Sequence, residues 1–389
     1  MRRIHKKLTL PALMAVALSS ALPAQAECPP PPIQWPTETW PDARAEVAAS
    51  RAAQIQALED YAFTLQGKDE ERKGLRTDGV VIIHKGRVVY ERYGRGFDAG
   101  KRHLAWSVSK SFTSALVGIA EKRGALKLDD SICQYVKAKR QDNCAITVRN
   151  LLEFASGLDW REDYENGGTY QTSSVLAMLY GEGRRDMVSF ITAHERSDEP
   201  GTSWRYSSGD TTLLAGVLDA ALRPSLGKDW PWVLLLDKLG MKSATWERDG
   251  KGVVVGSSYL HATPRDLAKF GFFYLNNGCW ADEQVLPADW VTQSTQVSRP
   301  IQMKAYELGG DDVQGWQWWL NRPLPGVRTE LPFPSVPEGA YAARGHWGQS
   351  ISIIPSKELI VVRTADDRDG SFSLDTFLKL ALAVVEELP

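Results

Sequence analysis

The stretch His103-Leu-Ala-Trp-Ser-Val-Ser-Lys-Ser-Phe-Thr-Ser114 decides how this chain is interpreted. It places Ser107 and Lys110 three residues apart at the head of an apolar run, 112–120, which predicts a helix ended by Gly124. Residues three apart share a helix face, so the Lys110 amine can approach the Ser107 hydroxyl. A serine hydroxyl becomes nucleophilic when a neighbouring base takes its proton, and an amine in a dry pocket can do so. The spacing therefore predicts a nucleophile at Ser107.

A second Ser-x-x-Lys match, Ser225-Leu-Gly-Lys228, serves as a test of that interpretation. Proline and glycine flank it, which predicts an exposed turn. The stretch after Ser107 is instead rich in small residues that can pack tightly in a core. Context therefore selects Ser107 over Ser225.

Two further stretches supply candidate partners for Ser107. In the segment 200–210, Tyr206 precedes Ser208 by two residues on a Gly/Pro-rich loop before an apolar helix, and its phenol could relay a proton to a leaving group. The segment 341–349 opens a C-terminal hairpin, where small residues on a predicted edge strand let substrate approach the backbone. An N–H there could stabilise an oxyanion together with the Ser107 N–H.

The N-terminus has the pattern of an export signal. Four basic residues precede a short apolar run, 8–22, and Ala24-Gln-Ala26 offers the small residues that a signal peptidase requires. We predict a signal peptide over 1–26, cleavage before Glu27, and a periplasmic or secreted mature protein. The apolar run is too short for a comfortable transmembrane span, so no stable membrane insertion is expected after cleavage.

Charge and cysteine content narrow the function classes. Residues 1–26 carry four basic and no acidic residues, so their removal changes the formal net charge from −2 to −6, and a nucleic-acid partner is not expected. The 6 histidines do not cluster and no Cys-x-x-Cys occurs, so we predict neither a metal nor another cofactor. The 4 cysteines of an exported chain fit two disulfides. Of the three pairings, Cys133–Cys144 with Cys28–Cys279 is preferred.

The order of apolar patterns predicts an α+β fold. Two hairpins are expected, at 79–91 and 349–363, and helices are expected at 42–63, 213–222, 234–239, 264–275, 287–294 and 374–388. The region between Leu128 and Leu222 shows no long β-branched strand. The simplest arrangement is an antiparallel sheet built from both chain ends, flanked by terminal helices, with a helical subdomain inserted. We assign the α/β part to about 27–125 and 245–389, and the helical part to about 126–244.

With its three motifs in this order, the chain resembles serine hydrolases related to class C β-lactamases. Those proteins carry Ser-x-x-Lys, then Tyr-x-Asn or Tyr-x-Ser, then a Lys-Thr-Gly-type strand. Segments 126–130, 148–158 and 263–268 also resemble the family, and the match runs from about Gly79 to the C-terminus. The resemblance implies a β-lactamase/transpeptidase-like fold. The chain is most similar to 6-aminohexanoate-dimer hydrolases and related carboxylesterases, through Ser107–Ser114, Glu162-Asp-Tyr164 and Gly348-Gln349.

The resemblance implies roles for the motif residues. Ser107 would be the acylated nucleophile, Lys110 its base and Tyr206 the proton shuttle. With Ala343-Arg344-Gly345 in the third-motif register, the His346 N–H is the second oxyanion donor; the alternative register, His346-Trp347-Gly348, moves that donor to Gln349. We also expect Tyr164, Trp347 and Ser208 to bind substrate.

Departures from the family pattern indicate the substrate class. Ser208 replaces the asparagine of β-lactamases, Ser257 falls where a polar substrate contact is expected, and the third motif lacks the lysine that binds a β-lactam carboxylate. Arg344 alternates with Ala343 along its strand, so its side chain should point away from the pocket. We therefore expect cleavage of small amide or ester substrates through an acyl-enzyme, with short-chain esters or linear amides preferred over β-lactams.

The alternative is a non-catalytic or penicillin-binding-protein-like relative, a sensor or D-Ala peptidase that acts on cell-wall peptides. Retention of Ser107, Lys110 and Tyr206 favours the hydrolase, since a protein that only binds needs neither base nor shuttle. The sequence predicts neither the natural substrate nor the oligomeric state.

Overall fold

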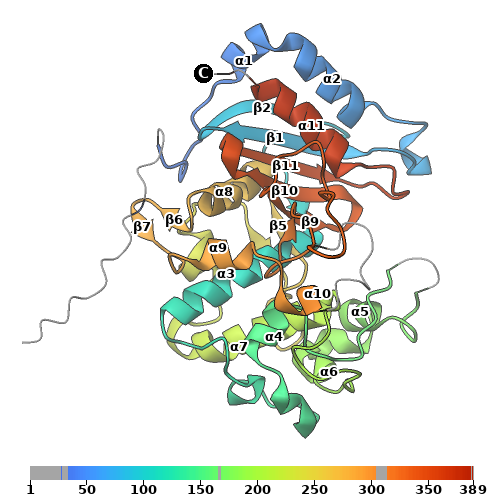
Figure 1. The fold of residues 1–389 in the computed structure, drawn as a ribbon, viewed down its shortest axis with the longest axis vertical. Helices are drawn as coiled ribbons and strands as arrows, with labels where there is room; N and C mark the ends of the chain where they lie inside the picture. The colour runs from blue at the N-terminus through green and yellow to red at the C-terminus, as the bar shows by residue number, and fades with distance from the viewer. Residues whose placement is uncertain (1–27, 29–33, 165–167, 304–312, 387, 389) are drawn as a thin grey trace, which may run out of the picture.

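A six-stranded antiparallel sheet runs through the molecule, with helices on both faces (Figure 1). This computed structural model describes residues 28, 34–164, 168–303, 313–386 and 388. The strands lie in the order β2 (Arg87–Tyr93), β1 (Thr77–His84), β11 (Leu359–Ala365), β10 (Gln349–Ile354), β9 (Tyr341–Gly345) and β8 (Trp319–Leu320). Because β1 pairs with β11, the two chain ends share one sheet, which confirms the predicted α+β architecture. The predicted signal peptide and its cleavage site lie outside the described residues.

Helices from the two chain ends cover one face of the sheet: α1 (Arg44–Ser50), α2 (Ala52–Phe63) and α11 (Leu374–Val385) (Figure 1). Alternation along the strands points Val80, Ile82 and Val361 into the core beneath these helices. The prediction of a single helix over 42–63 is wrong. Two helices form instead, because the chain leaves helical geometry at Arg51 (φ −128°, ψ 27°). The Ser50 hydroxyl donates to the Glu46 carbonyl, a local bond of the kind that bends helices.

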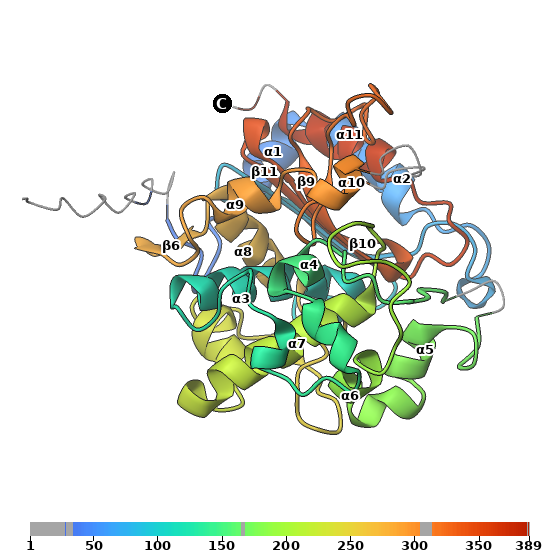
Figure 2. The same ribbon diagram turned by 60° about the horizontal axis from the view of Figure 1, so that its bottom comes forward.

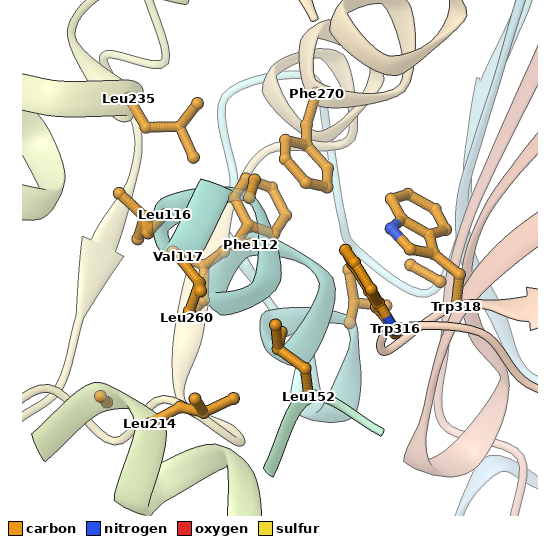
Figure 3. Close-up of a cluster of buried hydrophobic side chains, with 14 of the residues drawn as sticks. Phe112, Leu116, Val117, Leu152, Leu214, Leu235, Leu260, Phe270, Trp316 and Trp318 are labelled. Atoms are coloured by element: carbon orange, nitrogen blue, oxygen red, sulfur yellow. The ribbon is translucent and has the colours of Figure 1, made fainter. Parts of the chain in front are cut away.

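The opposite face of the sheet packs against α3 (Ser109–Lys122) and α8 (Pro264–Leu275). Figure 3 shows Phe112 of α3 lying against Phe270 of α8, and the two ring centroids are 3.6 Å apart. Trp318 also stacks nearly parallel to Phe270, with ring centroids 5.9 Å apart. This aromatic stack fixes α3, and hence the predicted nucleophile segment, relative to the sheet.

Small residues let α3 lie deep in the core. A Cβ added at Gly118 would come within 2.6 Å of the Trp290 ring, so only glycine allows this helix to approach so closely. The Ser111 and Ser114 hydroxyls donate to the carbonyls of Gln317 and Trp316, which anchors a neighbouring loop on the helix. The helix ends before Gly124, which adopts a left-handed conformation (φ 69°), as its sequence predicts.

A helical layer lies beyond α3, as Figure 2 shows. It contains α4 (Val148–Leu152), α5 (Ser174–Leu179), α6 (Met187–Ile191) and α7 (Ser208–Leu226). Within the described part of 128–222, helices and turns with isolated bridges replace strands, in agreement with the predicted helical middle.

Helix α7 is longer than the expected 213–222. It begins at Ser208 because the Ser207 hydroxyl accepts the Asp210 N–H as an N-cap. Its first residues are polar yet buried, so they lack the apolar pattern that marks a helix in the sequence. The helix also continues through Pro224 to Leu226, which places Ser225 in its last turn and corrects the predicted turn. Ser225 is exposed, and its hydroxyl donates to the Leu222 carbonyl.

The remaining elements are short. A small sheet has the order β3 (His103–Leu104), β5 (Leu260–Ala262), β4 (Thr245–Trp246), and a hairpin joins β6 (Cys279–Trp280) to β7 (Glu283–Gln284). The helix expected at 234–239 is a single π-helical turn, Trp232–Leu236. The helix expected at 287–294 begins only at Trp290 as α9 (Trp290–Ser294), and α10 (Arg299–Met303) follows. Only α8 matches its predicted bounds within this region.

Strand β9 is not the edge strand that the sequence suggests. The short strand β8 forms the edge of the sheet and pairs with β9 through Trp319↔Ala342 and Leu320↔Tyr341. The sequence signal was weak because β8 has only 2 residues. Its pairing stops before Ala343, so the end of β9 that carries the third motif extends past β8.

Two disulfides join the preferred cysteine pairs. Cys133–Cys144 closes a short loop beside the helical layer, whereas Cys28–Cys279 links positions 251 residues apart. The second bond holds the start of the described chain against the β6–β7 hairpin.

Candidate active site

Ser107 and Lys110 meet at the start of α3. Ser107 lies in a 3-10 turn, Trp106–Val108, directly before the helix, and Lys110 lies in the first helical turn. Lys110 Nζ is 2.9 Å from Ser107 Oγ. Ser107 is partly exposed whereas Lys110 is only 2% exposed, so the hydroxyl can meet a substrate while the amine stays dry.

Burial sets the electrostatics of Lys110. Its amine also lies 2.9 Å from Ser208 Oγ and 3.1 Å from the Ser257 carbonyl oxygen. Loss of hydration lowers the pKa of Lys110 to about 8, and the nearby Glu162 carboxylate opposes this shift. An amine with this pKa can accept a proton near neutral pH.

Tyr206 approaches the same two residues from the segment before α7. Its ring lies under the Lys110 ammonium position, with Nζ 4.9 Å from the ring centroid. Burial raises the pKa of Tyr206 above its ordinary value, and a hydrogen bond with Ser107 opposes the rise. The phenol is therefore protonated at neutral pH and lies within reach of the nucleophile. Phe154 and Trp319 hold the ring, with centroids 5.1 and 5.8 Å away.

Glu162 is a site residue to which the sequence analysis gave no role. Its carboxylate accepts the Ser208 hydroxyl (2.5 Å), the Ser208 backbone N–H (2.9 Å) and the Trp160 indole N–H (2.6 Å). The Tyr164 hydroxyl lies 3.3 Å from the same carboxylate. The segment Glu162-Asp-Tyr164 resembles the family, but Glu162 contacts Ser208 across a sequence separation of 46 residues. A contact between such distant residues produces no local sequence pattern from which it could be predicted.

The third motif is split between a strand and a turn. Ala343, Arg344 and Gly345 end β9, whereas His346–Gly348 form a 3-10 turn that leads into β10. A Cβ added at Gly345 would lie 2.4 Å from the Ala105 carbonyl oxygen. The end of β9 thus contacts the backbone just before Ser107.

Aromatic rings form one wall beside the nucleophile. The Tyr164 and His346 rings stack with centroids 4.9 Å apart, and Trp106 lies edge-on to both His346 (5.8 Å) and Trp347 (5.2 Å). Trp347 adopts a left-handed conformation (φ 59°) within its turn. Tyr164 and Trp347, both expected to bind substrate, therefore belong to one group of rings that includes Trp106, the residue before Ser107.

Arg344 lies on the opposite face of β9 from Ala343, as strand alternation predicts. Ala343 belongs to the core around α3, while the Arg344 guanidinium lies over the rings of Trp319 (4.8 Å) and Phe333 (5.8 Å). The Arg344 charge acts on Tyr206, where it favours the phenolate.

The structure brings together the predicted catalytic and substrate-binding residues, which are Ser107, Lys110, Tyr206, His346, Tyr164, Trp347 and Ser208. The assignment of Ser257 to substrate contact is wrong. Its side chain is fully buried and accepts the Thr212 hydroxyl, so only its carbonyl takes part, as an acceptor for Lys110.

Two general properties of the described residues bear on the chemistry. They include no group of three or more His, Cys, Asp or Glu side chains arranged to hold a metal ion. Across the same part of the chain, every helix is too short or too polar to cross a bilayer.

The chain is similar in sequence to known hydrolases and β-lactamases. The 6-aminohexanoate-dimer hydrolase of Paenarthrobacter ureafaciens is 24% identical over 248 residues, which cover 62% of this chain and 63% of that protein, just under two thirds of its length. A β-lactamase of Escherichia coli is 23% identical over 341 residues, covering 74% of this chain and 83% of that protein.

Solved structures share the fold. A class C β-lactamase superposes with a TM-score of 0.57 at 17% identity, covering 89% of this chain and 97% of that one. The octameric penicillin-binding protein homologue from Pyrococcus abyssi gives a TM-score of 0.59 at 17% identity, covering 89% and 79%. The family model described as β-lactamase matches residues 55–383. This chain therefore belongs to the β-lactamase family.

Proposed function

We propose that this protein is an exported serine hydrolase that cleaves an amide or ester bond of a small substrate through an acyl-enzyme on Ser107. The observation that carries the proposal is the approach of the buried Lys110 amine to Ser107 Oγ at 2.9 Å. Burial holds the pKa of this amine at about 8, which suits a general base. Membership of the β-lactamase family and the similarity to a 6-aminohexanoate-dimer hydrolase support the reaction class. Two disulfides are compatible with export.

The proposed reaction has two steps. In acylation, Lys110 takes the Ser107 proton as Oγ bonds to the substrate carbonyl carbon, and Tyr206 passes a proton to the leaving alcohol or amine as its bond breaks. Lys110 then returns its proton to Tyr206, so the amine is neutral again before deacylation. In deacylation, water gives a proton to Lys110 as it attacks the acyl carbon, and Lys110 passes that proton to Ser107 Oγ as the bond between Oγ and the acyl carbon breaks, which releases the acid. The backbone N–H groups of Ser107 and His346 are proposed to hold the oxyanion.

The substrate class is proposed from the third motif and the aromatic wall. A β-lactam carboxylate is expected to find no lysine at Ala343–Gly345, and the Arg344 guanidinium packs over the rings of Trp319 and Phe333. Tyr164 and Trp347 are proposed to contact an uncharged or flexible substrate instead. Ser208, which was also expected to bind substrate, is fully buried, and its hydroxyl faces Lys110 and Glu162. Short-chain esters and linear amides fit these residues better than β-lactams.

A parallel assay tests this proposal. We expect kcat/KM for p-nitrophenyl butyrate, or for a linear amide, to exceed kcat/KM for nitrocefin. A clear preference for nitrocefin would contradict the ester or amide assignment and would mean that Arg344 turns toward the ligand. Release of D-alanine from peptides without turnover of esters or linear amides would instead favour a peptidase that acts on cell-wall peptides.

A further inference from the structure

The oxygen atoms around Lys110 determine which hydroxyl its lone pair can face. Its amine faces three oxygen atoms: Ser107 Oγ at 2.9 Å, Ser208 Oγ at 2.9 Å and the Ser257 carbonyl oxygen at 3.1 Å. A neutral amine offers two N–H donors and one lone pair. The Ser257 carbonyl can only accept, so it takes one N–H. The lone pair then faces whichever hydroxyl, Ser107 or Ser208, does not accept the second N–H.

Glu162 decides this choice, because it determines where the Ser208 proton goes. A carboxylate only accepts hydrogen bonds, and Glu162 Oε1 lies 2.5 Å from Ser208 Oγ. The single Ser208 hydroxyl proton therefore points at Glu162, and its oxygen lone pairs remain for Lys110. The indole N–H of Trp160 (2.6 Å) and the Ser208 backbone N–H (2.9 Å) both donate to Oε2, which holds the carboxylate in place.

We propose that Glu162 is a positioning residue: by accepting the Ser208 proton it makes Ser208 an obligate acceptor for Lys110, and so directs the amine lone pair at Ser107. This inference rests on the proposed function. The Ser107 proton moves to Lys110 Nζ as Oγ bonds to the substrate carbon, and the resulting ammonium donates to all three oxygens. No other proton has to move for Ser107 to be activated.

Several titratable or charged groups surround Glu162 and Lys110. Tyr164 follows Glu162 on the same loop, and His346 stacks on Tyr164. Tyr206 lies just before α7, and Asp210 lies in its first turn. Arg344 acts on this set through Tyr206. Glu162 is the carboxylate that acts on Lys110, and it raises the pKa of that amine. Its loss should therefore lower the pKa of Lys110 further.

The test compares Glu162→Gln with wild type on p-nitrophenyl butyrate across pH. An amide can donate to Ser208, which frees the Ser208 proton to compete for the Lys110 lone pair. We expect kcat to fall by roughly 10-fold or more, with KM within about 3-fold, as for a perturbed general base. The acid limb of kcat/KM, expected near pH 8 in wild type, should move to lower pH. A purely structural role would not move that limb.

Asp163→Asn is the matched control. Asp163 is an exposed carboxylate next to Glu162, so the substitution removes the same charge one residue away. We expect its kcat and its acid limb to equal those of wild type. If Asp163→Asn shifts the limb as much as Glu162→Gln does, general electrostatics explain the effect and the positioning role is wrong.

Ser208→Ala provides a second route in case Glu162→Gln does not fold. It should lower kcat at nearly constant KM, and adding Glu162→Gln to it should cost little more, since both changes break one relay. Wild-type kcat in Ser208→Ala, or losses that multiply in the double variant, would overturn the inference. Mass spectrometry of wild type treated with a fluorophosphonate, whose adduct is not released by deacylation, separates the two proposals. Without an adduct on Ser107 the proposed function fails, whereas an adduct with an unaffected Glu162→Gln contradicts only this inference.

Discussion

At the scale of single residues, the burial of Lys110 is the condition for the proposed chemistry. The side chain is 2% exposed, and burial lowers its pKa to about 8. About one amine in ten is then neutral at pH 7, compared with fewer than about one in a thousand for an ordinary lysine. The exposed Lys228 that follows Ser225 lacks this environment, although its spacing to a serine is the same.

Tyr206 is expected to matter for turnover rather than for binding. Tyr206→Phe removes the phenol that is proposed to pass a proton to the leaving group, but it keeps the ring that packs against Phe154 and Trp319. We expect kcat on p-nitrophenyl butyrate to fall by ~10²–10⁴-fold with a nearly unchanged KM. Tyr170→Phe, at a tyrosine that is 58% exposed, should match wild type. A change in KM alone in Tyr206→Phe would disprove the shuttle role.

The residues that could be predicted from the sequence are those whose relation is local. Ser107 and Lys110 lie one helical turn apart, so their spacing alone predicts their contact. Glu162 could not be given its role, because it meets Ser208 and Lys110 only once the loop before α5 folds onto α7. Ser257 was misassigned because its backbone, not its side chain, faces the site.

At the scale of elements, a single glycine controls the approach of β9 to the turn before α3. Gly345 has extended backbone geometry that any residue can adopt, so glycine is required here only because it has no side chain. A Cβ would lie 2.4 Å from the Ala105 carbonyl oxygen, too close for either backbone to tolerate without moving.

Gly345→Ala should therefore push β9 away from the nucleophile turn. We expect a loss of ~1–3 kcal/mol in the free energy of unfolding from overpacking, and a fall in kcat of about 10-fold or more as the proposed oxyanion donors separate. Urea unfolding and steady-state kinetics measure the two effects. Gly100→Ala, where the nearest atom to an added Cβ is an Asp98 carboxylate oxygen at 3.4 Å, is the control. Equal behaviour of the two variants would show that β9 does not position the site.

Element prediction succeeded where apolar periodicity was continuous and failed where it was not. The strands around 79–91 and 349–363 and the helix α8 appear as expected because their alternation or helical repeat is regular. The start of α7 was missed because Ser208, Asp210 and Thr211 are polar residues that are buried by tertiary contacts. β8 was missed because two residues carry no periodic signal.

At the scale of the whole molecule, the site depends on segments that are distant in sequence. The nucleophile comes from the turn before α3, and Glu162 and Tyr164 come from a loop in the helical layer. Tyr206 lies just before α7, Ser208 is its first residue, and His346 lies in the β9–β10 turn. Pairing of β1 with β11 brings the C-terminal strands beside the N-terminal ones, so the site is complete only when both chain ends have joined the sheet. The sequence order of the three motifs predicted this fold through family resemblance, whereas the relative placement of the loops required the structure.

The central claim is that Ser107 is the residue acylated by substrate. Reaction of the purified protein with a fluorophosphonate, followed by intact-protein and peptide mass spectrometry, tests it most directly. We predict one adduct per chain, mapped to Ser107, which is absent in a folded Ser107→Ala variant and unchanged in Ser225→Ala. An adduct that persists in Ser107→Ala, or hydrolysis of p-nitrophenyl butyrate by that variant at the wild-type rate, would contradict the account.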